Sequence, residues 1–241
     1  MPRYGLLGKT LNYSFSKTFF EAYFSKHEIP ATFENIEIPS IEEATNVINS
    51  NFSGLTVTIP YKEQIIPYLD ELSPEAREIG AVNVIQFKAG KKIGHNTDAY
   101  GFQQSIKPFL TNKHERAIVL GTGGAAKAIT HVFKSLGINV VSISRNPKGA
   151  NQFPYEAINN HMINACKVIV NCTPVGTFPS NDDKIAIPFE FLTNEHLVVD
   201  LIYNPPKTAF LKAAELNGAT VLNGESMLKE QALKAWDIWN Q

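Results

Sequence analysis

A glycine-rich turn between a buried strand and a helix constrains the fold of this chain more than any other feature. The turn reads GTGGAA at 121–126 and opens a helical pattern at about 125–136. Gly121 permits the tight turn, Gly123 lets the backbone approach a pyrophosphate, and the small Ala126 lets helix and strand pack closely. Phosphates would then lie against the free N–H groups at the helix start. The turn predicts a Rossmann-type nucleotide-binding lobe, and the alternative is a structural glycine turn with no ligand.

Short β-rich runs alternate with helical patterns along the chain, which is typical of βαβ units and a mostly parallel sheet. The expected strands lie at 4–7, 32–38, 55–59, 82–87, 117–120, 139–144, 167–170, 197–202 and 220–222. The expected helices lie at about 16–27, 41–50, 61–70, 74–79, 125–136 and 227–239. The sequence therefore predicts an α/β fold, with the boundary between two lobes somewhere in 99–115.

Three local signals predict where elements end. Ser73 followed by Pro74 predicts an N-cap and a first helical residue. Gly137 predicts the C-terminal stop of the helix at 125–136. The sequence KAGK at 88–91 predicts a surface hairpin turn.

The charge balance and the cysteines exclude several classes of protein. The chain has 22 Lys and Arg against 23 Asp and Glu, whereas nucleic-acid binding normally needs a basic excess. No apolar run reaches the ~18 residues of a membrane span. Cys166 and Cys172 form neither a zinc-ligand spacing nor a disulfide framework. We therefore expect a cytoplasmic protein without a metal and without a nucleic-acid or membrane partner.

The end of the strand at 139–144 indicates which nucleotide binds. An NAD site usually has a carboxylate at this place, which holds the ribose 2′-hydroxyl. This chain has Ser144 and Arg145 instead, and an arginine presents planar donors suited to a phosphate dianion. The pattern favours NADP. The alternative for Arg145 is a solvated side chain at a strand end.

Two serines and a lysine in the first half are further candidates. Ser14 and Ser16 lie at the start of a helix, where two hydroxyls can hold a carboxylate, although Ser16 is also an ordinary N-cap candidate. Lys62 lies in the first turn of the expected helix at 61–70, where the helix dipole disfavours a cation. A lysine placed against its local preference hints at function, and the alternative is an exposed side chain bent back into water.

Asn83 and Asp98 belong to short motifs, although each alone also fits a strand start or a helix N-cap. In one order the chain carries a Ser-x-Ser pair at 14–16, VTIPYK at 57–62, AVN at 81–83, NTD at 96–98, GTGGAAKA at 121–128, NCTPVG at 171–176, DLIYNPPKT at 200–208 and a Gly-to-Gln segment at 224–231. Over nearly the whole chain this set closely resembles the shikimate dehydrogenase family, whose members reduce 3-dehydroshikimate with NADPH.

The resemblance implies a substrate lobe at 1–104, a Rossmann NADP lobe at 105–222, and a C-terminal helix at 223–241 that returns to the first lobe. It implies that shikimate or 3-dehydroshikimate is bound by Ser14, Ser16, Thr58, Lys62, Asn83, Asp98, Tyr203 and Gln231. It implies that NADP is bound by Gly121, Thr122, Gly123, Gly124, Ala125, Ser144, Arg145, Lys148, Thr173, Leu201 and Gly224. Two positions depart from the usual family pattern: Lys148 is a candidate replacement for a second arginine, and Ser226 stands where a glycine is frequent.

The implied reaction delivers a hydride from NADPH to a ring ketone and adds one proton to the developing alkoxide. Lys62 is suited to donate that proton, and Asp98 would pair with the lysine and hydrogen-bond the neighbouring hydroxyl. Which of the two catalytic residues moves the proton is left open. Also open are quinate as a substrate, a non-catalytic nucleotide-binding regulator, and the choice between a monomer and a homodimer.

Overall fold

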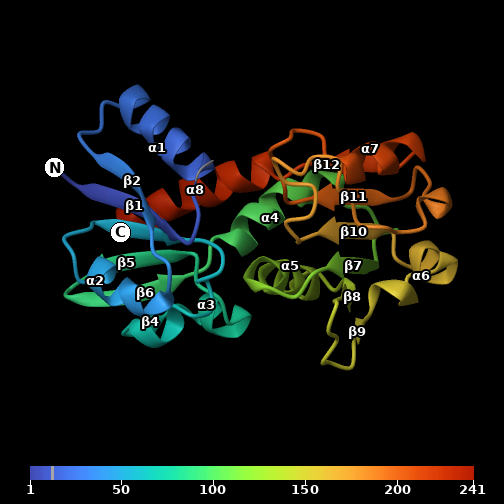
Figure 1. The fold of residues 1–241 in the computed structure, drawn as a ribbon, viewed down its shortest axis with the longest axis horizontal. Coiled ribbons are helices and arrows are strands. Elements are labelled where there is room, and N and C mark those ends of the chain that lie inside the picture. Colours follow the sequence, from blue (N-terminus) through green and yellow to red (C-terminus); the bar gives the residue numbers. More distant parts are fainter. Residues whose placement is uncertain (12–13) are drawn as a thin grey trace. The chain divides into compact units, whose positions relative to one another are not determined.

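The strands form two separate six-stranded sheets in the computed structural model, which describes residues 1–11 and 14–241. Each sheet lies in its own unit (Figure 1): unit 1 comprises Met1–Gly101 and Leu228–Gln241, and unit 2 comprises Phe102–Met227. Helices and strands alternate in both units. The expected α/β class is therefore confirmed, whereas the domain boundaries at 104/105 and 222/223 stay a prediction.

Unit 1 contains a mixed sheet in the order β2-β1-β3-β5-β6-β4. Its strands are β1 (Arg3–Gly8), β2 (Thr32–Glu37), β3 (Gly54–Val57), β4 (Glu71–Leu72), β5 (Val84–Lys88) and β6 (Lys91–His95). Its helices are α1 (Phe15–Lys26), α2 (Ala44–Ile48), α3 (Pro74–Ile79), the start of α4 (Asp98–Ile106) and most of α8 (Glu225–Trp239). β1 pairs in parallel with β2 and β3, whereas β5 runs antiparallel to β3 and β6.

Successive side chains in the sheet of unit 1 face two different hydrophobic cores. Tyr4 and Leu6 of β1 pack with buried residues of α1 and α8, whereas Leu7 packs with those of α2 and α3. Val84 and Ile85 of β5 divide between the two cores in the same way. Because side chains alternate across a strand, this sheet is covered on both faces.

The last helix, α8, is fastened to the sheet of unit 1 by side chains at its C-terminal end. Trp239 Nε1 donates a hydrogen bond to Ile85 O at 3.1 Å. Gln86 Nε2 donates another to Ile238 O at 2.6 Å. Gly54 makes room for the indole, because a Cβ at residue 54 would lie 2.4 Å from the Trp239 ring. The expected return of the C-terminal helix to the first lobe is confirmed.

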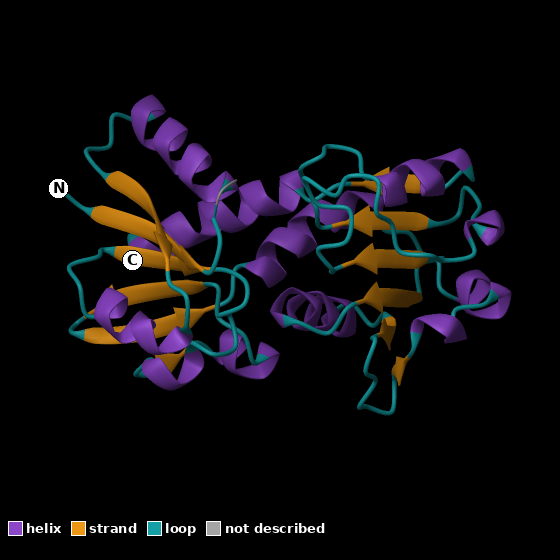
Figure 2. Cartoon of the chain, in the orientation of Figure 1, coloured by secondary structure: helices purple, strands orange, loops and turns teal. Residues whose placement is uncertain are grey.

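Unit 2 contains a parallel sheet in the order β12-β11-β10-β7-β8-β9. Its strands are β7 (Arg116–Leu120), β8 (Asn139–Ile143), β9 (Gln152–Phe153), β10 (Val168–Asn171), β11 (Leu197–Asp200) and β12 (Thr220–Leu222). Its helices are α5 (Gly124–Ser135), α6 (Asn160–Ala165), α7 (Ala209–Leu216) and the rest of α4. The carboxyl ends of these strands form one edge (Figure 2). The strand order reverses at β7, and open α/β sheets bind ligands beside such a switch point.

Two expected helices differ from the structure. The expected helix at 61–70 is wrong, since 61–65 form turns and Ile66–Tyr68 is a 3-10 helix. Pro67 explains the difference, because proline lacks an N–H and its ring clashes with the carbonyl four residues earlier. The expected helix at 41–50 is a 3-10 helix at Ile41–Glu43 followed by the short α2.

The predicted element ends are confirmed. Ser73 Oγ accepts a hydrogen bond from Ala76 N–H at 3.1 Å and caps α3. Gly137 ends α5 with φ of +74°. The turn at 88–91 joins β5 to β6, but the polar strand β6 and the two-residue strands β4 and β9 were not expected. Among the described residues, no helix has the length and apolar character needed to cross a membrane.

Candidate active site

Lys62 lies in a loop after β3 whose backbone is fixed on both sides. Tyr61 is buried, its hydroxyl donates to Ile38 O at 2.6 Å, and its N–H donates to Thr58 O at 2.9 Å. The carbonyl of Lys62 accepts a hydrogen bond from Val82 N–H at 2.7 Å. The loop therefore holds the Lys62 backbone in one place although it has no helical structure.

The Lys62 side chain forms an ion pair with Asp98. Its Nζ lies 2.6 Å from Asp98 Oδ2, and the two side chains are 15% and 2% exposed. Asp98 lies in the first turn of α4, but the N–H of Ala99 bonds to Asn96 Oδ1 at 3.2 Å. Asn96 thus does the capping that the sequence alone allowed for Asp98, and the carboxylate of Asp98 is available to the lysine.

Asn83 connects this ion pair to the last helix. Its Nδ2 lies 3.0 Å from Asp98 Oδ1 and 3.2 Å from Gln231 Oε1 on α8. Its Oδ1 accepts the backbone N–H of Thr97 at 2.7 Å, and the Thr97 hydroxyl lies 3.0 Å from Asn83 Nδ2. The structure thus brings together four of the predicted site residues. It adds Thr97, which lies in the NTD motif but carries no local signal that distinguishes it from a spacer.

The helix dipole expected to act on Lys62 is absent, because residues 61–65 form turns with no α-helix. The sequence-based reason for choosing Lys62 is therefore wrong. The ion pair with Asp98, which is 36 residues away in the chain, is what distinguishes Lys62 from a solvated lysine. The structure also excludes the alternative of a side chain bent into water, since the side chain is 15% exposed.

The two serines near the start of the chain have different positions in α1 from those expected from the sequence. Ser14, and not Ser16, is the N-cap of α1, because Ser14 Oγ accepts a hydrogen bond from Lys17 N–H at 3.2 Å. Ser16 lies inside the first turn of α1. Both serines, together with the half-buried Thr58, belong to unit 1, whereas Tyr203 lies in unit 2 in the loop after β11. Residues 12 and 13, which precede Ser14, lie outside the described residues.

The glycine turn of unit 2 has the geometry that a pyrophosphate needs. Gly121 has φ of +108°, which disfavours other residues, and Gly123 is the N-cap of α5. A Cβ on Gly123 would meet nothing within 4 Å, so the space over this residue is open to a ligand. Ala126 is 3% exposed and packs in the core, as its small size predicts. Thr122, Gly124 and Ala125 complete the turn and the first residues of the helix.

The polar residues after β8 lie on the surface of unit 2. Arg145 is exposed, and no carboxylate pairs with it within the described part of the chain. Burial raises the pKa of the nearby Tyr155, and the charge of Arg145 opposes this shift. Ser144 Oγ accepts a hydrogen bond from Asn146 N–H at 3.2 Å, and Lys148 is exposed. Among the described residues, the guanidinium of Arg145 at the end of β8 is therefore not neutralised by a carboxylate.

The remaining predicted cofactor residues lie beyond the carboxyl ends of β10, β11 and β12. Thr173 contacts the glycine turn, because a Cβ at Gly121 would lie 3.2 Å from its Cγ2. Gly224 packs so closely on Leu201 that a Cβ there would lie 2.0 Å from the Leu201 carbonyl oxygen. A side chain at residue 224 would therefore push these two loops apart.

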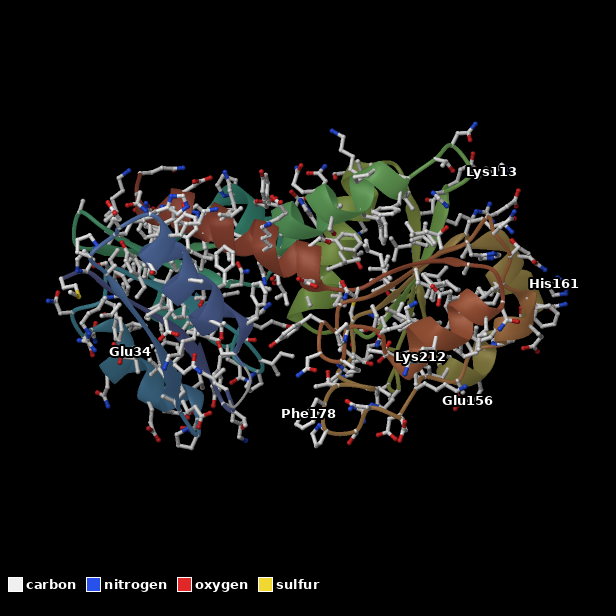
Figure 3. All side chains as sticks on the ribbon, turned by 90° about the horizontal axis from the view of Figure 1, so that it is seen from above. Glu34, Lys113, Glu156, His161, Phe178 and Lys212 are labelled. Carbon is white, nitrogen blue, oxygen red and sulfur yellow. The ribbon has the colours of Figure 1, made fainter. Side chains whose placement is uncertain are left out.

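A cavity of about 460 Å³ lies at the opposite end of the unit 2 sheet. Its lining includes Lys113, His114, Glu195 and His196, which precede β7 and β11. Figure 3 shows Lys113 at the end of the unit away from Phe178, which lies in the loop after β10. No predicted site residue lines this cavity, so it is not the nucleotide site.

Comparison with known proteins places the chain in a family. A family model described as the shikimate dehydrogenase substrate binding domain matches residues 6–85. A shikimate dehydrogenase (NADP(+)) of Clostridium botulinum is 35% identical over 246 residues, covering 98% of this chain and 95% of the relative. The chain belongs to the shikimate dehydrogenase family.

Solved structures agree with this assignment to the shikimate dehydrogenases. Shikimate 5-dehydrogenase from Thermus thermophilus, in complex with NADP(H) and shikimate, matches with a TM-score of 0.87 and 30% identity over 99% of this chain and 93% of that one. Quinate dehydrogenase from Corynebacterium glutamicum, in complex with NAD, also matches with a TM-score of 0.87, at 27% identity over 99% and 93% of the two chains. Both lobes predicted from the motifs are thus present in known structures.

One departure from the usual shikimate dehydrogenase pattern has a structural consequence. Ser226 stands in the first turn of α8, where a glycine is frequent in the family. Its Oγ is buried and has no hydrogen-bond partner among the described residues. The serine therefore adds a buried hydroxyl whose hydrogen bond is unmade, which a glycine would not do.

Proposed function

We propose that this chain catalyses the reversible reduction of 3-dehydroshikimate to shikimate with NADPH, and that Lys62 and Asp98 are its catalytic residues. The observation that carries the proposal is the ion pair of 2.6 Å between them, which Asn83 connects to Gln231. A mostly buried lysine held by a carboxylate is a positioned proton donor for a developing alkoxide. The family to which the chain belongs supports the same reaction.

The chain's residues stabilise and protonate the reacting oxygen. The nicotinamide of NADPH supplies the hydride when it is bound. The Lys62 ammonium stabilises the negative charge that develops on the ring oxygen as the ketone becomes an alcohol. Asp98 holds that ammonium in place and accepts a hydrogen bond from the neighbouring ring hydroxyl. One proton then moves to the alkoxide from this pair. Lys62 is the more accessible of the two, with 15% of its side chain exposed against 2% for Asp98.

The other substrate residues bind the carboxylate and the ring hydroxyls. Ser14 and Ser16 supply hydroxyls near the N-terminus of α1, and Tyr203 supplies a phenol from unit 2. We assign these three to the shikimate carboxylate. We assign the ring hydroxyls to Thr58, Asn83 and Gln231.

Three observations on unit 2 fit NADP: the open space over Gly123, the positive φ of Gly121, and the guanidinium of Arg145, which pairs with no carboxylate among the described residues. We assign the pyrophosphate to the start of α5, where free N–H groups meet anions. Arg145, with Ser144 and Lys148, is assigned to the 2′-phosphate. The complete set proposed for NADP is Gly121, Thr122, Gly123, Gly124, Ala125, Ser144, Arg145, Lys148, Thr173, Leu201 and Gly224.

A single assay tests the function. The chain is mixed with shikimate and NADP⁺, and the absorbance of the reduced nicotinamide is followed. We expect reduction of NADP⁺ that depends on shikimate. No reduction by the well-folded chain would contradict the proposal and favour a nucleotide-binding regulator of the same fold.

Quinate is a second candidate substrate, because the chain also matches a quinate dehydrogenase in complex with NAD. The same assay with quinate in place of shikimate, and with NAD⁺ in place of NADP⁺, separates the two functions. We expect kcat/KM to be highest for shikimate with NADP⁺. The cofactor preference follows from Ser144 and Arg145, which stand where an NAD site usually has a carboxylate.

The remaining parts of the proposal concern location and assembly. Neither Cys166 nor Cys172 is part of a disulfide in the described part of the chain, which supports a reducing, cytoplasmic compartment. The only partners proposed are the small molecules, and the chain acts as a monomer or a homodimer. Light scattering of the purified chain distinguishes these two states.

A further inference from the structure

Two fully buried side chains face each other at the carboxyl edge of the unit 2 sheet. Asn171 ends β10 and Asp200 ends β11, and the two residues are partners in the parallel pairing of these strands. Both are 0% exposed, and Asn171 Nδ2 donates to Asp200 Oδ1 at 3.0 Å. Asn171 opens the NCTPVG motif and Asp200 opens the DLIYNPPKT motif, but the sequence assigned neither residue a role. Together they form a polar group inside an otherwise apolar sheet.

The hydrogen bonds of Asn171 reach the loop after β10. Its Oδ1 accepts both the backbone N–H and the hydroxyl of Thr173, at 2.9 and 2.7 Å. Thr173 is therefore held by two hydrogen bonds to a side chain that cannot move into solvent. The side chain of Asn171 thus fixes the residue that contacts the glycine turn.

The hydrogen bonds of Asp200 reach the loop after β11 and the next helix. Its Oδ1 accepts the N–H of Ile202 at 3.1 Å, and its Oδ2 accepts the hydroxyl of Thr208 at 2.7 Å. Thr208 caps α7 by accepting the N–H of Leu211 at 3.2 Å. The carboxylate thus holds both ends of the loop that contains Leu201 and Tyr203.

The two loops also contact each other above this buried pair. Phe178 N–H donates to Asn204 O at 3.2 Å, which links the loop after β10 to the loop after β11. Gly176 packs against Ile202 and Thr208, since a Cβ there would lie within 4.0 Å of both. A displacement of one loop would therefore displace the other.

Burial makes this arrangement costly. The pKa of Asp200 is raised to about 6, chiefly by burial, while its three hydrogen-bond donors act in the opposite direction. No Lys or Arg pairs with Asp200 in the described part of the chain. A buried carboxylate with only neutral donors contributes little net stability, because desolvation opposes its hydrogen bonds. Its specific effect is on geometry, since it fixes the positions of the groups that donate to it.

We propose that Asn171 and Asp200 are positioning residues, which set the two loops for NADP and for the carboxylate of shikimate. This inference rests on the proposed function, because it takes Thr173, Leu201 and Tyr203 as binding residues. Neither Asn171 nor Asp200 needs to touch a ligand. They act by holding the binding residues before the ligands arrive, which lowers the ordering cost of binding.

The test compares binding with stability in variants of the full chain. Asn171→Ala removes the acceptor of both Thr173 hydrogen bonds, and Asp200→Asn keeps the shape and one oxygen of the side chain. His196→Ala is the matched control, because His196 is 1% exposed and precedes the other end of β11. The dissociation constant of NADP⁺ is measured by titration calorimetry, KM and kcat by steady-state kinetics, and Tm by thermal unfolding.

We expect Asn171→Ala to raise the NADP⁺ dissociation constant and the KM for shikimate about tenfold, with kcat changed about threefold or less. Asp200→Asn should raise the NADP⁺ dissociation constant and the KM for shikimate less, because asparagine keeps the shape and one oxygen of the aspartate side chain. His196→Ala should lower Tm without raising the dissociation constant of NADP⁺. If His196→Ala weakens NADP⁺ as much as Asn171→Ala does, or if Asn171→Ala binds like the parent, the positioning role is wrong.

Two further outcomes are decided by the same set. If Asn171→Ala does not fold, Thr208→Val takes its place. It removes one donor to Asp200 together with the N-cap of α7, so its Tm is measured beside its ligand binding, and unchanged ligand binding by that variant overturns the proposal. If the parent chain binds NADP⁺ and oxidises shikimate, and the variants bind the ligands equally well, only the positioning role is overturned. A parent chain that does neither overturns the proposed function itself.

Discussion

Each unit of this protein contains a buried aspartate joined to an asparagine and a threonine, and the two groups differ by one lysine. In unit 1, Asn83 lies between Asp98 and the Thr97 backbone. In unit 2, Asn171 lies between Asp200 and Thr173 in the same manner. Asp98 pairs with Lys62, whereas Asp200 has neutral donors alone among the described residues.

The difference matches the two roles proposed for these polar groups. The cation beside Asp98 compensates a buried charge and has 15% of its side chain exposed, so it can reach a substrate. The neutral set around Asp200 is sealed, with both residues of the pair 0% exposed. A group that does chemistry needs a partially accessible, charged member, whereas a group that holds loops needs only fixed hydrogen bonds.

The largest effect is expected for Lys62→Met, which removes the lysine that distinguishes the two groups. The variant keeps an unbranched side chain, one atom shorter than that of lysine, but has no proton donor. We expect kcat to fall roughly 10²- to 10⁴-fold, with the KM for shikimate changing far less. Steady-state kinetics at saturating NADP⁺ measures both values.

Lys92→Met is the matched control for this substitution. Lys92 lies on β6 in the sheet of unit 1. Its Nζ is 3.6 Å from Asp70 Oδ2, and its side chain is 25% exposed. We expect a kcat close to that of the parent chain. If Lys62→Met also keeps a near-normal kcat, Lys62 has no part in catalysis and the distinction between the two groups disappears.

The next effect concerns the stability that Asp200 contributes at different pH. The folded pKa is about 6, above the ordinary value of 3.8. Its contribution is therefore full below the unfolded pKa and is lost as the pH rises through about 6. A pKa difference of this size corresponds to about 3 kcal/mol of unfolding free energy.

Urea unfolding of the parent and of Asp200→Asn, at pH values from about 4 to 7.5, measures this loss. The stability of the parent relative to the variant should fall by up to about 3 kcal/mol over that range. A difference between the two chains that stays constant with pH would mean that Asp200 is not desolvated as the structure indicates.

A smaller effect is expected for Arg145→Ala, which tests whether Arg145 of unit 2 binds the 2′-phosphate of NADP⁺. Loss of a charge-assisted contact with the 2′-phosphate is worth about 1.5–3 kcal/mol, or roughly 10- to 150-fold in NADP⁺ affinity. The affinity for NAD⁺ should stay level, because NAD⁺ lacks that phosphate. The ratio of kcat/KM for NADP⁺ over NAD⁺ must fall.

Arg116→Ala controls for the loss of a positive charge, since Arg116 is exposed at the amino end of β7. It should leave the cofactor ratio unchanged. Lys148 lies three positions beyond Arg145 and reduces the expected effect if it shares the phosphate. An unchanged ratio in Arg145→Ala would show that this arginine does not read the 2′-phosphate.

The smallest effect separates capping from binding in unit 1. Ser14→Ala removes the N-cap of α1 and should lower the unfolding free energy by about 1 kcal/mol. Ser16→Ala should not lower it, because Ser16 lies inside the helix. Both variants should weaken shikimate binding and leave NADP⁺ binding unchanged. Calorimetry measures the binding, and urea unfolding measures the stability. Normal shikimate affinity in both variants would leave Ser14 with capping as its sole role.

Local features of the sequence determined the Rossmann turn and most of the strands. The turn at 121–126 depends on backbone freedom at Gly121 and on the small Ala126, and both properties belong to the residues themselves. The apolar runs of β7, β10 and β11 are buried in the sheet, as a parallel sheet covered on both faces requires. The motif set was specific enough to identify the family before any geometry was known.

Tertiary structure alone decided the environment of the polar site residues. Asn83 and Gln231 lie 148 residues apart in the chain, and their contact depends on α8 packing against β5. Asn171 and Asp200 meet because their strands are neighbours in one particular register. A hydrophobic period predicts which face of an element is buried, but it does not specify which strand lies beside it. The expected helix around Lys62 fails for a local reason, Pro67, whereas the ion pair of Lys62 with Asp98 joins two distant segments and depends on tertiary structure.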